Sequence, residues 1–352
     1  MGEKLLMKGN EAIAEAAIRA GCRHYFGYPI TPQTEIAHYM AKKMPEVGGT
    51  FVQAESEIAA INMVYGAASA GVRVMTSSSS PGISLKQEGI SYAAGAELPA
   101  VIVNIVRCGP GLGGILPAQC DYFQAVKGGG HGDYKMVVLA PSSVQELYEL
   151  TVEAFNIADK YRQLTMIMGD GILGQMMEAV EFRDEENIVK VDKPWATTGT
   201  GLKREHNTIQ SIYIQPEVLE EHNRKLQKKY RLIEENEVRV ETYNCEDAEI
   251  IVAAFGTTAR IVNNVIKMAE KEGIKVGLIR PITLWPFPVK EFEKYAEVPK
   301  AFLSVELNAG QMVEDVKLAV NGKRPVYFYG RMGGMIPTQK EILDQIKQIL
   351  NK

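Results

Sequence analysis

The chain has 352 residues, 46% of them hydrophobic and 23% charged, as expected of an ordinary globular protein of two or three domains. Its net charge of -4 excludes a general nucleic-acid binder, because neutralising phosphates requires a basic surface. No apolar run approaches the roughly 18 residues of a membrane span, and the amino terminus lacks the apolar stretch of a signal peptide. We therefore expect a cytoplasmic protein that binds neither nucleic acid nor membrane.

The four cysteines are scattered along the chain, at Cys22, Cys108, Cys120 and Cys245, and no two form a CxxC pair. This spacing is typical of neither a zinc site nor an iron–sulfur ligand run. We expect reduced, buried thiols and no metal bound by this chain. If the protein takes part in redox chemistry, its clusters must lie on another chain.

The first half of the chain alternates short apolar runs with helical patterns. Helices are predicted over 10–20, 56–70 and 142–161, and strands over 72–75, 100–106, 136–140 and 165–169. All-apolar strands that alternate with helices indicate a parallel sheet covered on both faces, and therefore an α/β fold.

Residues 187–247 are polar and predict a linker arm, which could pack across a partner. Within this arm a charged helix is predicted, with a thin apolar stripe of Val218, Leu219, Leu226 and Ile233. The α/β pattern then resumes, with strands over 249–256, 275–281, 301–307 and 325–330, and helices over 257–272 and 338–351. The expected organisation is thus a first domain over 1–186, an arm over 187–247 and a smaller domain over 248–352.

The segment YFGYPITPQTE, residues 25–35, ends a predicted strand and places Thr31 before Pro32. Threonine is favoured at a helix N-cap and proline at the first helical position, so we expect Thr31 to start a helix. It could be a simple cap. A helix start at the carboxyl edge of a parallel sheet also favours anions, so the Thr31 hydroxyl could bind a substrate carboxylate.

Glu55 and Glu57 stand where an apolar strand gives way to an almost wholly apolar helix. A carboxylate at a helix start can simply complement the helix dipole. Alternatively, a buried glutamate there could hold or donate a proton.

Gly109, Gly111 and Gly114 form a GxGxxG pattern after the strand over 100–106. An NAD site would need a helix directly after this loop and an acidic residue about 20 positions on, and neither is present. Arg107, at the end of the strand, suits a carboxylate or the phosphates of CoA, or else a structural ion pair.

Two further loops could contribute polar groups. His131 and Asp133 lie in a glycine-rich loop, where a histidine is more often solvated than catalytic. Asp170 belongs to a GDG triplet that resembles the start of the motif binding thiamine diphosphate through Mg²⁺, but no Asn pair follows it. We therefore expect Asp170 to end a strand and the diphosphate metal to lie on another chain.

Taken together, these segments resemble one known subunit type, the alpha subunit of the 2-oxoacid:ferredoxin oxidoreductases. The resemblance covers nearly the whole chain, and its most specific motifs are YPITP at 28–32 and LIRPITLWPFP at 278–288. Further matches are the helix over 55–71, Arg107 with its Gly/Pro loop, GHGD at 130–133, VELNAGQM at 305–312 and GRMGGMIPT at 330–338. The resemblance implies a pyrimidine-binding (thiamine diphosphate) domain followed by a transketolase C-terminal-like domain.

The resemblance also implies a role for each matching residue. Glu57 matches the glutamate that hydrogen-bonds the pyrimidine ring of thiamine diphosphate, with Tyr28 and Glu55 beside the cofactor. Thr31, Pro29 and Arg107 match substrate-binding positions, and His131 and Asp133 are possible loop contacts.

The family implies CoA-dependent oxidative decarboxylation of a 2-oxoacid to acyl-CoA and CO₂, with thiamine diphosphate shared between subunits. A beta subunit would hold the diphosphate and Mg²⁺, and iron–sulfur clusters would lie on that subunit and a ferredoxin-like subunit. A gamma subunit and ferredoxin complete the expected partners. The alternative is a non-catalytic scaffolding subunit of the same fold, in which Glu57 only caps a helix.

The substrate is predicted from the loop after Arg107. Leu112, Ile115 and Leu116 suit an aliphatic side chain, and no second cation is present for a distal carboxylate. These residues favour a branched-chain 2-oxoacid, 2-oxoisovalerate, over the 2-oxoglutarate and pyruvate types, which remain alternatives.

Overall fold

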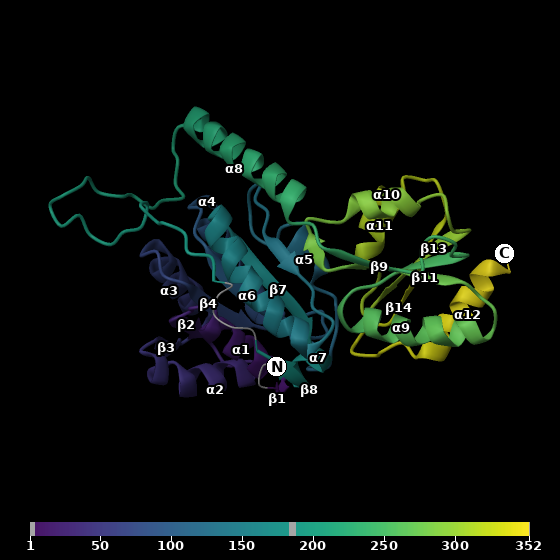
Figure 1. Ribbon diagram of the computed structural model, residues 1–352. Helices are drawn as coiled ribbons and strands as arrows, with labels where there is room; N and C mark the ends of the chain where they lie inside the picture. The colour runs from purple at the N-terminus through teal and green to yellow at the C-terminus, as the bar shows by residue number, and fades with distance from the viewer. Residues whose placement is uncertain (1–3, 183–187, 352) are drawn as a thin grey trace.

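The structure is a computed structural model that describes residues 4–182 and 188–351. It contains two mainly parallel sheets covered by helices, one in each half of the chain (Figure 1). The predicted α/β fold with two parallel-sheet domains is confirmed. The expected boundary between residues 186 and 187 falls within the segment 183–187, outside the described residues, and the three-part division stays a prediction.

The first sheet has seven strands in the order β12-β6-β7-β5-β4-β2-β3. All neighbouring pairs are parallel except β12 and β6, which are antiparallel. Its central strand β5 is buried along its whole length, which explains its unbroken apolar sequence. The strands are β2 (His24–Gly27), β3 (Thr50–Gln53), β4 (Val74–Ser78), β5 (Ala100–Val106), β6 (Val137–Leu139), β7 (Leu164–Asp170) and β12 (Thr283–Trp285).

The helices of the first half form two packed groups. One group has α1 in contact with α2, α6 and α7, and the other has α3 in contact with α4. Right-handed crossovers between parallel strands place the two groups on opposite faces of the sheet. The helices are α1 (Gly9–Arg19), α2 (Thr34–Lys43), η1 (Pro45–Val47), α3 (Glu57–Ser69), α4 (Pro81–Gly95), α5 (Tyr122–Val126), α6 (Val144–Tyr161) and α7 (Gly171–Gln175). Helix α4 was not among the predicted elements.

The second sheet has five strands in the order β14-β13-β10-β11-β9, of which only β9 is antiparallel to its neighbour. Helices α9 and α12 lie side by side on one face, and α10 and α11 pack together on the other (Figure 1). Thr338 caps α12 and forms a capping box with Glu341, so the predicted cap is confirmed. The strands are β9 (Val240–Tyr243), β10 (Ile250–Ala253), β11 (Val276–Pro281), β13 (Ala301–Glu306) and β14 (Val326–Gly330), and the helices are α9 (Gly256–Lys271), α10 (Val289–Tyr295), α11 (Met312–Val320) and α12 (Gln339–Leu350).

Strand β12 joins the two halves, because it follows β11 in the chain but pairs with β6 at the edge of the first sheet. Gln119 adds buried hydrogen bonds between the halves: its side-chain Nε2 donates to the Phe255 carbonyl at 2.8 Å, and its Oε1 accepts from the Leu307 amide at 3.0 Å. A small antiparallel sheet of β1 (Lys4–Lys8) and β8 (Met177–Glu181) completes the first half. The two sheets are therefore held together by both backbone and side-chain contacts.

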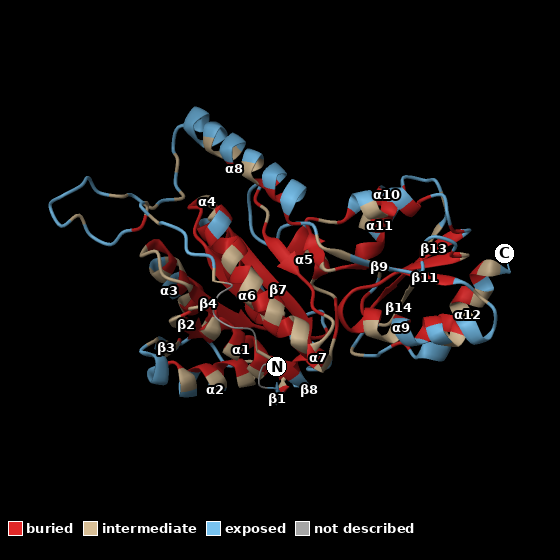
Figure 2. Ribbon diagram, in the orientation of Figure 1, coloured by how far each residue is buried: buried red, intermediate tan, exposed pale blue. Residues whose placement is uncertain are grey.

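The predicted charged helix is α8, Pro216–Asn236, which lies on the outside of the first half and is largely exposed (Figure 2). Its buried residues are Leu226, Tyr230 and Ile233. Val218 and Leu219, predicted for the same stripe, are instead exposed because the first turns of α8 extend beyond the sheet. In the described residues no helix is both long and apolar enough to cross a bilayer.

Candidate active site

Several of the predicted functional residues lie at the carboxyl edge of the first sheet. Strand β2 is followed in the chain by β3 on one side and then by β4 on its other side, so the order reverses between β2 and β4. Ligands of open α/β sheets bind at such a reversal, outside the carboxyl ends of the strands. Tyr28 follows β2, Glu57 begins the helix after β3, and Arg107 follows β5.

The structure separates the two candidate glutamates clearly. The Glu57 side chain starts α3 and is 5% exposed, whereas Glu55, two residues earlier, is exposed. Ser56 takes the N-cap position between them and accepts a hydrogen bond from the Ala59 amide at 3.2 Å. Because Ser56 already caps α3, capping does not account for the burial of Glu57.

The start of helix α4 lies against the Glu57 carboxylate. A Cβ atom added to Gly82 would lie 2.6 Å from Glu57 Oε1 and 2.1 Å from Ser78 Oγ. Only glycine allows this approach, which brings the positive end of the α4 dipole next to a carboxylate. Ser78 Oγ is itself buried and has no hydrogen-bond partner in the described residues.

A buried polar network that the sequence analysis missed lies beneath this contact. Lys86 on α4 is fully buried and donates to Thr76 Oγ1 at 2.7 Å and to the Ser77 carbonyl at 3.1 Å. The Ser77 hydroxyl hydrogen-bonds Tyr25 at 2.6 Å and Gln33 at 2.5 Å. The network thus connects α4 with the segment after β2. In sequence, Lys86 stands beside Gln87 and Glu88, as an exposed lysine would, and nothing in that pattern indicates burial.

The prediction that Thr31 starts a helix is wrong. Helix α2 begins at Thr34 with Gln33 at its N-cap, and Thr31 lies in an exposed turn. The physical reason is the buried Gln33 side chain, whose amide donates to the Tyr28 carbonyl at 3.3 Å and holds residues 28–33 as a loop. Tyr28 and Pro29 are also exposed at this edge, so their side chains can meet a ligand.

Arg107 is 7% exposed and binds two backbone carbonyls rather than a carboxylate. Its guanidinium donates to the Thr31 carbonyl at 3.1 Å and to the Leu112 carbonyl at 3.0 Å. Arg107 Nε is buried without a partner, and within the described part of the chain no acidic group pairs with this side chain. The structural ion pair considered for Arg107 is therefore not formed, and the cation instead joins the loop after β2 to the loop after β5.

The glycine-rich loop after Arg107 does not lead into a helix, and the next helix is the short α5. The GxGxxG pattern thus lacks the geometry of a dinucleotide site. The loop instead borders a pocket of about 620 Å³ between the two halves, whose lining includes Arg107, Cys120 and Asn308. Leu112, Ile115 and Leu116 of this loop are exposed.

Asp170 ends β7, as predicted, and its side chain caps α7 by accepting from the Ile172 and Leu173 amides at 2.9 and 3.2 Å. His131 lies elsewhere, beside Ser91 and Tyr92 of α4. Ser91 is nine residues along α4 from Gly82, or roughly 13 Å at 1.5 Å per residue. The chain thus does not bring His131 to Glu57.

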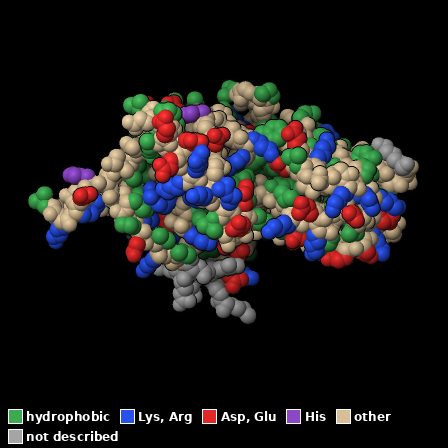
Figure 3. Space-filling model, turned by 90° about the horizontal axis from the view of Figure 1, so that it is seen from above, with side chains coloured by type: hydrophobic (Ala, Val, Ile, Leu, Met, Phe, Trp, Pro, Cys, Tyr) green, Lys and Arg blue, Asp and Glu red, His purple; other side chains and the backbone are tan. Residues whose placement is uncertain are grey.

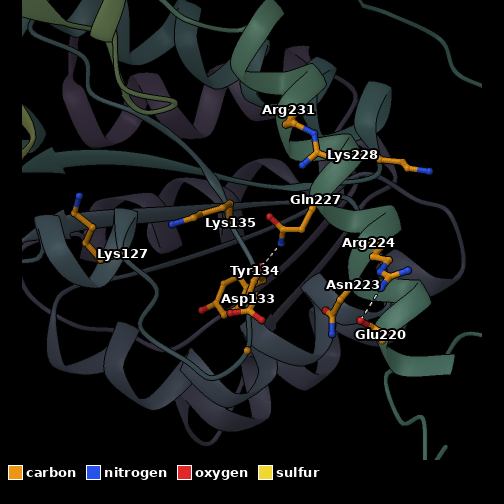
Figure 4. A pocket seen from close by; sticks show the side chains of 11 residues that line it. Lys127, Asp133, Tyr134, Lys135, Glu220, Asn223, Arg224, Gln227, Lys228 and Arg231 are labelled. Atoms are coloured by element: carbon orange, nitrogen blue, oxygen red, sulfur yellow. Dashed lines mark hydrogen bonds and ion pairs between the residues drawn. The ribbon is translucent and has the colours of Figure 1, made fainter. Parts of the chain in front are cut away.

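Asp133 lines a surface groove of about 690 Å³ between its loop and α8. Figure 4 shows Gln227 of α8 pointing to Asp133, whose carbonyl accepts its amide at 2.8 Å. Figure 3 shows Lys and Arg side chains gathered over α8 on this face. The cationic side chains of the groove are Lys127, Lys135, Arg224, Lys228 and Arg231. Asp133 therefore belongs to a basic surface groove, apart from the edge that holds Glu57.

The cysteines behave as structural thiols. Cys22, Cys108 and Cys245 are buried and unbonded to one another, and Cys120 is partly buried. Burial raises the pKa of the Cys22 thiol to about 12 and the pKa of Cys120 and of Cys245 to about 11. In the described residues no three His, Cys, Asp or Glu side chains group as metal ligands would.

Comparisons with known proteins agree with this geometry. Residues 15–242 match the profile of the pyruvate flavodoxin/ferredoxin oxidoreductase thiamine-diphosphate-binding domain, and residues 248–342 match core domain II of pyruvate:ferredoxin oxidoreductase. The ketoisovalerate oxidoreductase subunit VorB of Methanothermobacter marburgensis is 53% identical, over 98% of this chain and 97% of that protein. The 2-oxoglutarate synthase subunit KorA of the same organism is 38% identical, over 98% and 99%.

A solved structure of 2-oxoglutarate:ferredoxin oxidoreductase from Magnetococcus marinus, with 2-oxoglutarate, coenzyme A and succinyl-CoA bound, superposes with a TM-score of 0.88 at 27% identity. The match covers 99% of this chain and 66% of that chain. A split-gene transketolase, at a TM-score of 0.60 and 14% identity over 98% of each chain, shares the fold.

The chain therefore belongs to the pyruvate flavodoxin/ferredoxin oxidoreductase family, the 2-oxoacid:ferredoxin oxidoreductases that its motifs resemble. Its relatives are oxidoreductase subunits that work in complexes, and its first half is a thiamine-diphosphate-binding domain. The family resemblance inferred from the sequence is confirmed, and the roles assigned to single residues stay predictions.

Proposed function

We propose that this chain provides the aminopyrimidine side of a thiamine diphosphate site in a multi-subunit ketoisovalerate oxidoreductase. The reaction is the CoA-dependent oxidative decarboxylation of 2-oxoisovalerate to acyl-CoA and CO₂, with electrons passing to ferredoxin. A beta subunit holds the diphosphate, Mg²⁺ and iron–sulfur clusters, and gamma and ferredoxin-like subunits complete the complex. The cytoplasmic location expected from the sequence stays a prediction.

The observation that carries the proposal is the burial of Glu57 at the point where the strand order reverses. A carboxylate there can share a proton with a ring nitrogen, and this keeps the heterocycle in one orientation. When bound, thiamine diphosphate supplies the carbanion chemistry of decarboxylation, while the protein orients it and excludes water. In the described residues no side chain competes with a ligand for a hydrogen bond to the Glu57 carboxylate.

The surface around Glu57 supports a site completed by another subunit. Ile58 and Met63 on α3 are 51% and 39% exposed, and Leu85 and Tyr92 on α4 are 50% and 39% exposed. These side chains lie on the two helices that border Glu57. Exposed apolar side chains on the helices beside a buried carboxylate are what a subunit interface would cover.

The aliphatic character of the Arg107 loop supports a branched-chain substrate. Leu112, Ile115 and Leu116 are exposed where they can meet a ligand, and Arg107 holds this loop against Thr31. The high identity to ketoisovalerate oxidoreductase subunits points to the same substrate. The 2-oxoglutarate type is the second candidate, supported by the relatives at 38% identity and by the Magnetococcus structure.

The test of the proposal is Glu57→Gln in the assembled complex, with Glu55→Gln as the matched control. Glutamine keeps the size of the side chain but cannot share a proton in the same way, so turnover should fall by at least about 100-fold. Glu55→Gln tests the competing assignment: if Glu57 is the glutamate that meets the ring nitrogen, Glu55→Gln should keep turnover near that of the wild type.

Size-exclusion chromatography must show that both variants assemble. Near-normal turnover of an assembled Glu57→Gln complex would favour the scaffolding alternative. Initial rates with 2-oxoisovalerate, 2-oxoglutarate and pyruvate, each with CoA and a low-potential acceptor, would decide the substrate. A higher kcat/KM for 2-oxoglutarate would overturn the branched-chain proposal.

A further inference from the structure

Lys86 is a fully buried lysine placed one helical turn from the residue that touches Glu57. Positions four apart lie on the same face of a helix, so Lys86 follows Gly82 along the face of α4 that meets α3 and β4. The rise per turn is about 5.4 Å. Gly82 lies against Glu57 and Ser78, and the Lys86 ammonium group donates to the carbonyl of Ser77, the residue next to Ser78.

The surroundings of Lys86 solvate its charge only in part. Nζ donates two hydrogen bonds, to Thr76 Oγ1 and to the Ser77 carbonyl, and both acceptors are uncharged. In the described residues no carboxylate lies within ion-pair distance of Nζ, yet Glu57 acts on it electrostatically. Burial lowers the pKa of Lys86 to about 7, against the opposing attraction of Glu57.

We propose that Lys86 is a positioning residue whose positive charge attracts the Glu57 carboxylate and helps to hold it in place for a ring nitrogen. This inference rests on the function proposed above for Glu57. The start of α4, at Gly82, presents the positive end of the helix dipole to the same carboxylate. When Lys86 loses its proton, its own contribution to this attraction disappears.

Other titratable groups near the pair do not replace Lys86. Tyr25 on β2 reaches it only through Ser77, and burial raises the pKa of that phenol, so Tyr25 stays neutral across the working range. Asp121 lies on the far side of Asn104, which donates to it at 2.9 Å. Burial raises the pKa of Asp121. Glu57 on α3 is the charged group that acts on Lys86.

The test compares kcat/KM of the wild-type complex with that of Lys86→Met across the pH range from about 6 to about 9. Methionine has a similar length but no charge, so the variant corresponds to the wild type with a neutral lysine. We expect the wild-type value to exceed the variant about tenfold at about pH 6, which corresponds to about 1.4 kcal/mol of orienting interaction. The ratio should fall towards one at about pH 9, because wild-type Lys86 is then neutral.

The matched control is Lys229→Met on α8, a partly buried lysine whose pKa burial also lowers but whose partner is Glu97. The ratio of the wild-type kcat/KM to that of Lys229→Met should not change with pH. A ratio for Lys86→Met that is constant across the same range would show that Lys86 contributes only packing and would overturn the inference.

Two further variants keep the test decisive. If Lys86→Met does not assemble, Lys86→Arg carries a permanent charge, and its kcat/KM relative to the wild type should rise with pH. A flat ratio in that variant would equally refute the inference. The Glu57→Gln complex separates the two proposals. If the Glu57→Gln complex turns over normally, the proposed function is wrong. If it is inactive while the kcat/KM ratios of the Lys86 variants do not change with pH, only the proposed role of Lys86 is wrong.

Discussion

Replacing Gly82 by alanine tests the contact between α4 and Glu57 directly. The new Cβ would lie 2.1 Å from Ser78 Oγ and 2.6 Å from Glu57 Oε1, and both distances require a neighbour to move. Both atoms end side chains, so the overlap can be relieved by displacing the Glu57 carboxylate rather than the backbone. The variant should therefore fold, with its carboxylate about 1 Å out of place.

The stability change follows from two opposing contributions. Overpacking costs about 1–3 kcal/mol, and the low end applies here because side-chain ends can move. Exchanging glycine for alanine within a helix returns about 0.5–1 kcal/mol. We expect a net loss of at most about 1 kcal/mol in the free energy of unfolding. A carboxylate misplaced by about 1 Å should lower kcat/KM by about 100-fold.

Gly66→Ala on α3 is the matched control, since a Cβ added to Gly66 meets no atom within 4 Å. It should stabilise the chain by about 0.5–1 kcal/mol and leave turnover unchanged. Urea denaturation of the full chain and initial rates of the assembled complex measure the two quantities. A Gly82→Ala complex that retains turnover within about twofold of the wild type would refute the proposed importance of this contact.

Two further predictions concern stability. Gln119→Leu should lower the free energy of unfolding by about 1–3 kcal/mol, because the Leu307 amide loses its buried partner while the Phe255 carbonyl keeps the Thr258 hydroxyl, and a urea midpoint equal to that of the wild type would contradict it. Burial raises the pKa of Glu97, but Lys229 and Lys225 outweigh burial and hold it below the ordinary 4.5, so its folded form stays ionised. A carboxyl group whose pKa is lower in the folded than in the unfolded chain stabilises the fold at pH values above its unfolded-state pKa. This stabilisation is lost as the pH falls below about 4.5. The stability difference between wild type and Glu97→Gln should therefore shrink on acidification, and unfolding curves at neutral and acid pH measure it.

The fold was predictable where the local sequence of a segment is enough to indicate its structure. Strand β5 was expected over 100–106 and is observed as Ala100–Val106, because a strand buried on both faces must be apolar throughout. The start of α12 was equally clear from Thr338. By contrast, nothing local in Thr283–Trp285 shows that β12 leaves its own half to pair with β6. Such long-range pairing is decided by tertiary contacts.

The site was predictable only in part, for a related reason. Two candidate glutamates were evident from the residue pattern alone, and their different burial depends on how α3 and α4 pack. Lys86 was missed because its neighbours Gln87 and Glu88 make the helix look solvent-facing. The helix expected at Thr31 starts later because Gln33 turns inward, a choice that the Thr-Pro pattern cannot show.

The composition of helix α3 supports the proposal that a second subunit covers the site. Its sequence is apolar on nearly every side, and a helix of that kind is normally buried all round. In this chain only one side of α3 packs on the sheet and α4, which leaves Ile58 and Met63 exposed. The composition of α3 thus matches its surroundings only if another protein surface covers the exposed side. Since Glu57 begins the same helix and is already buried within this chain, a surface that covers Ile58 and Met63 would lie directly beside this carboxylate.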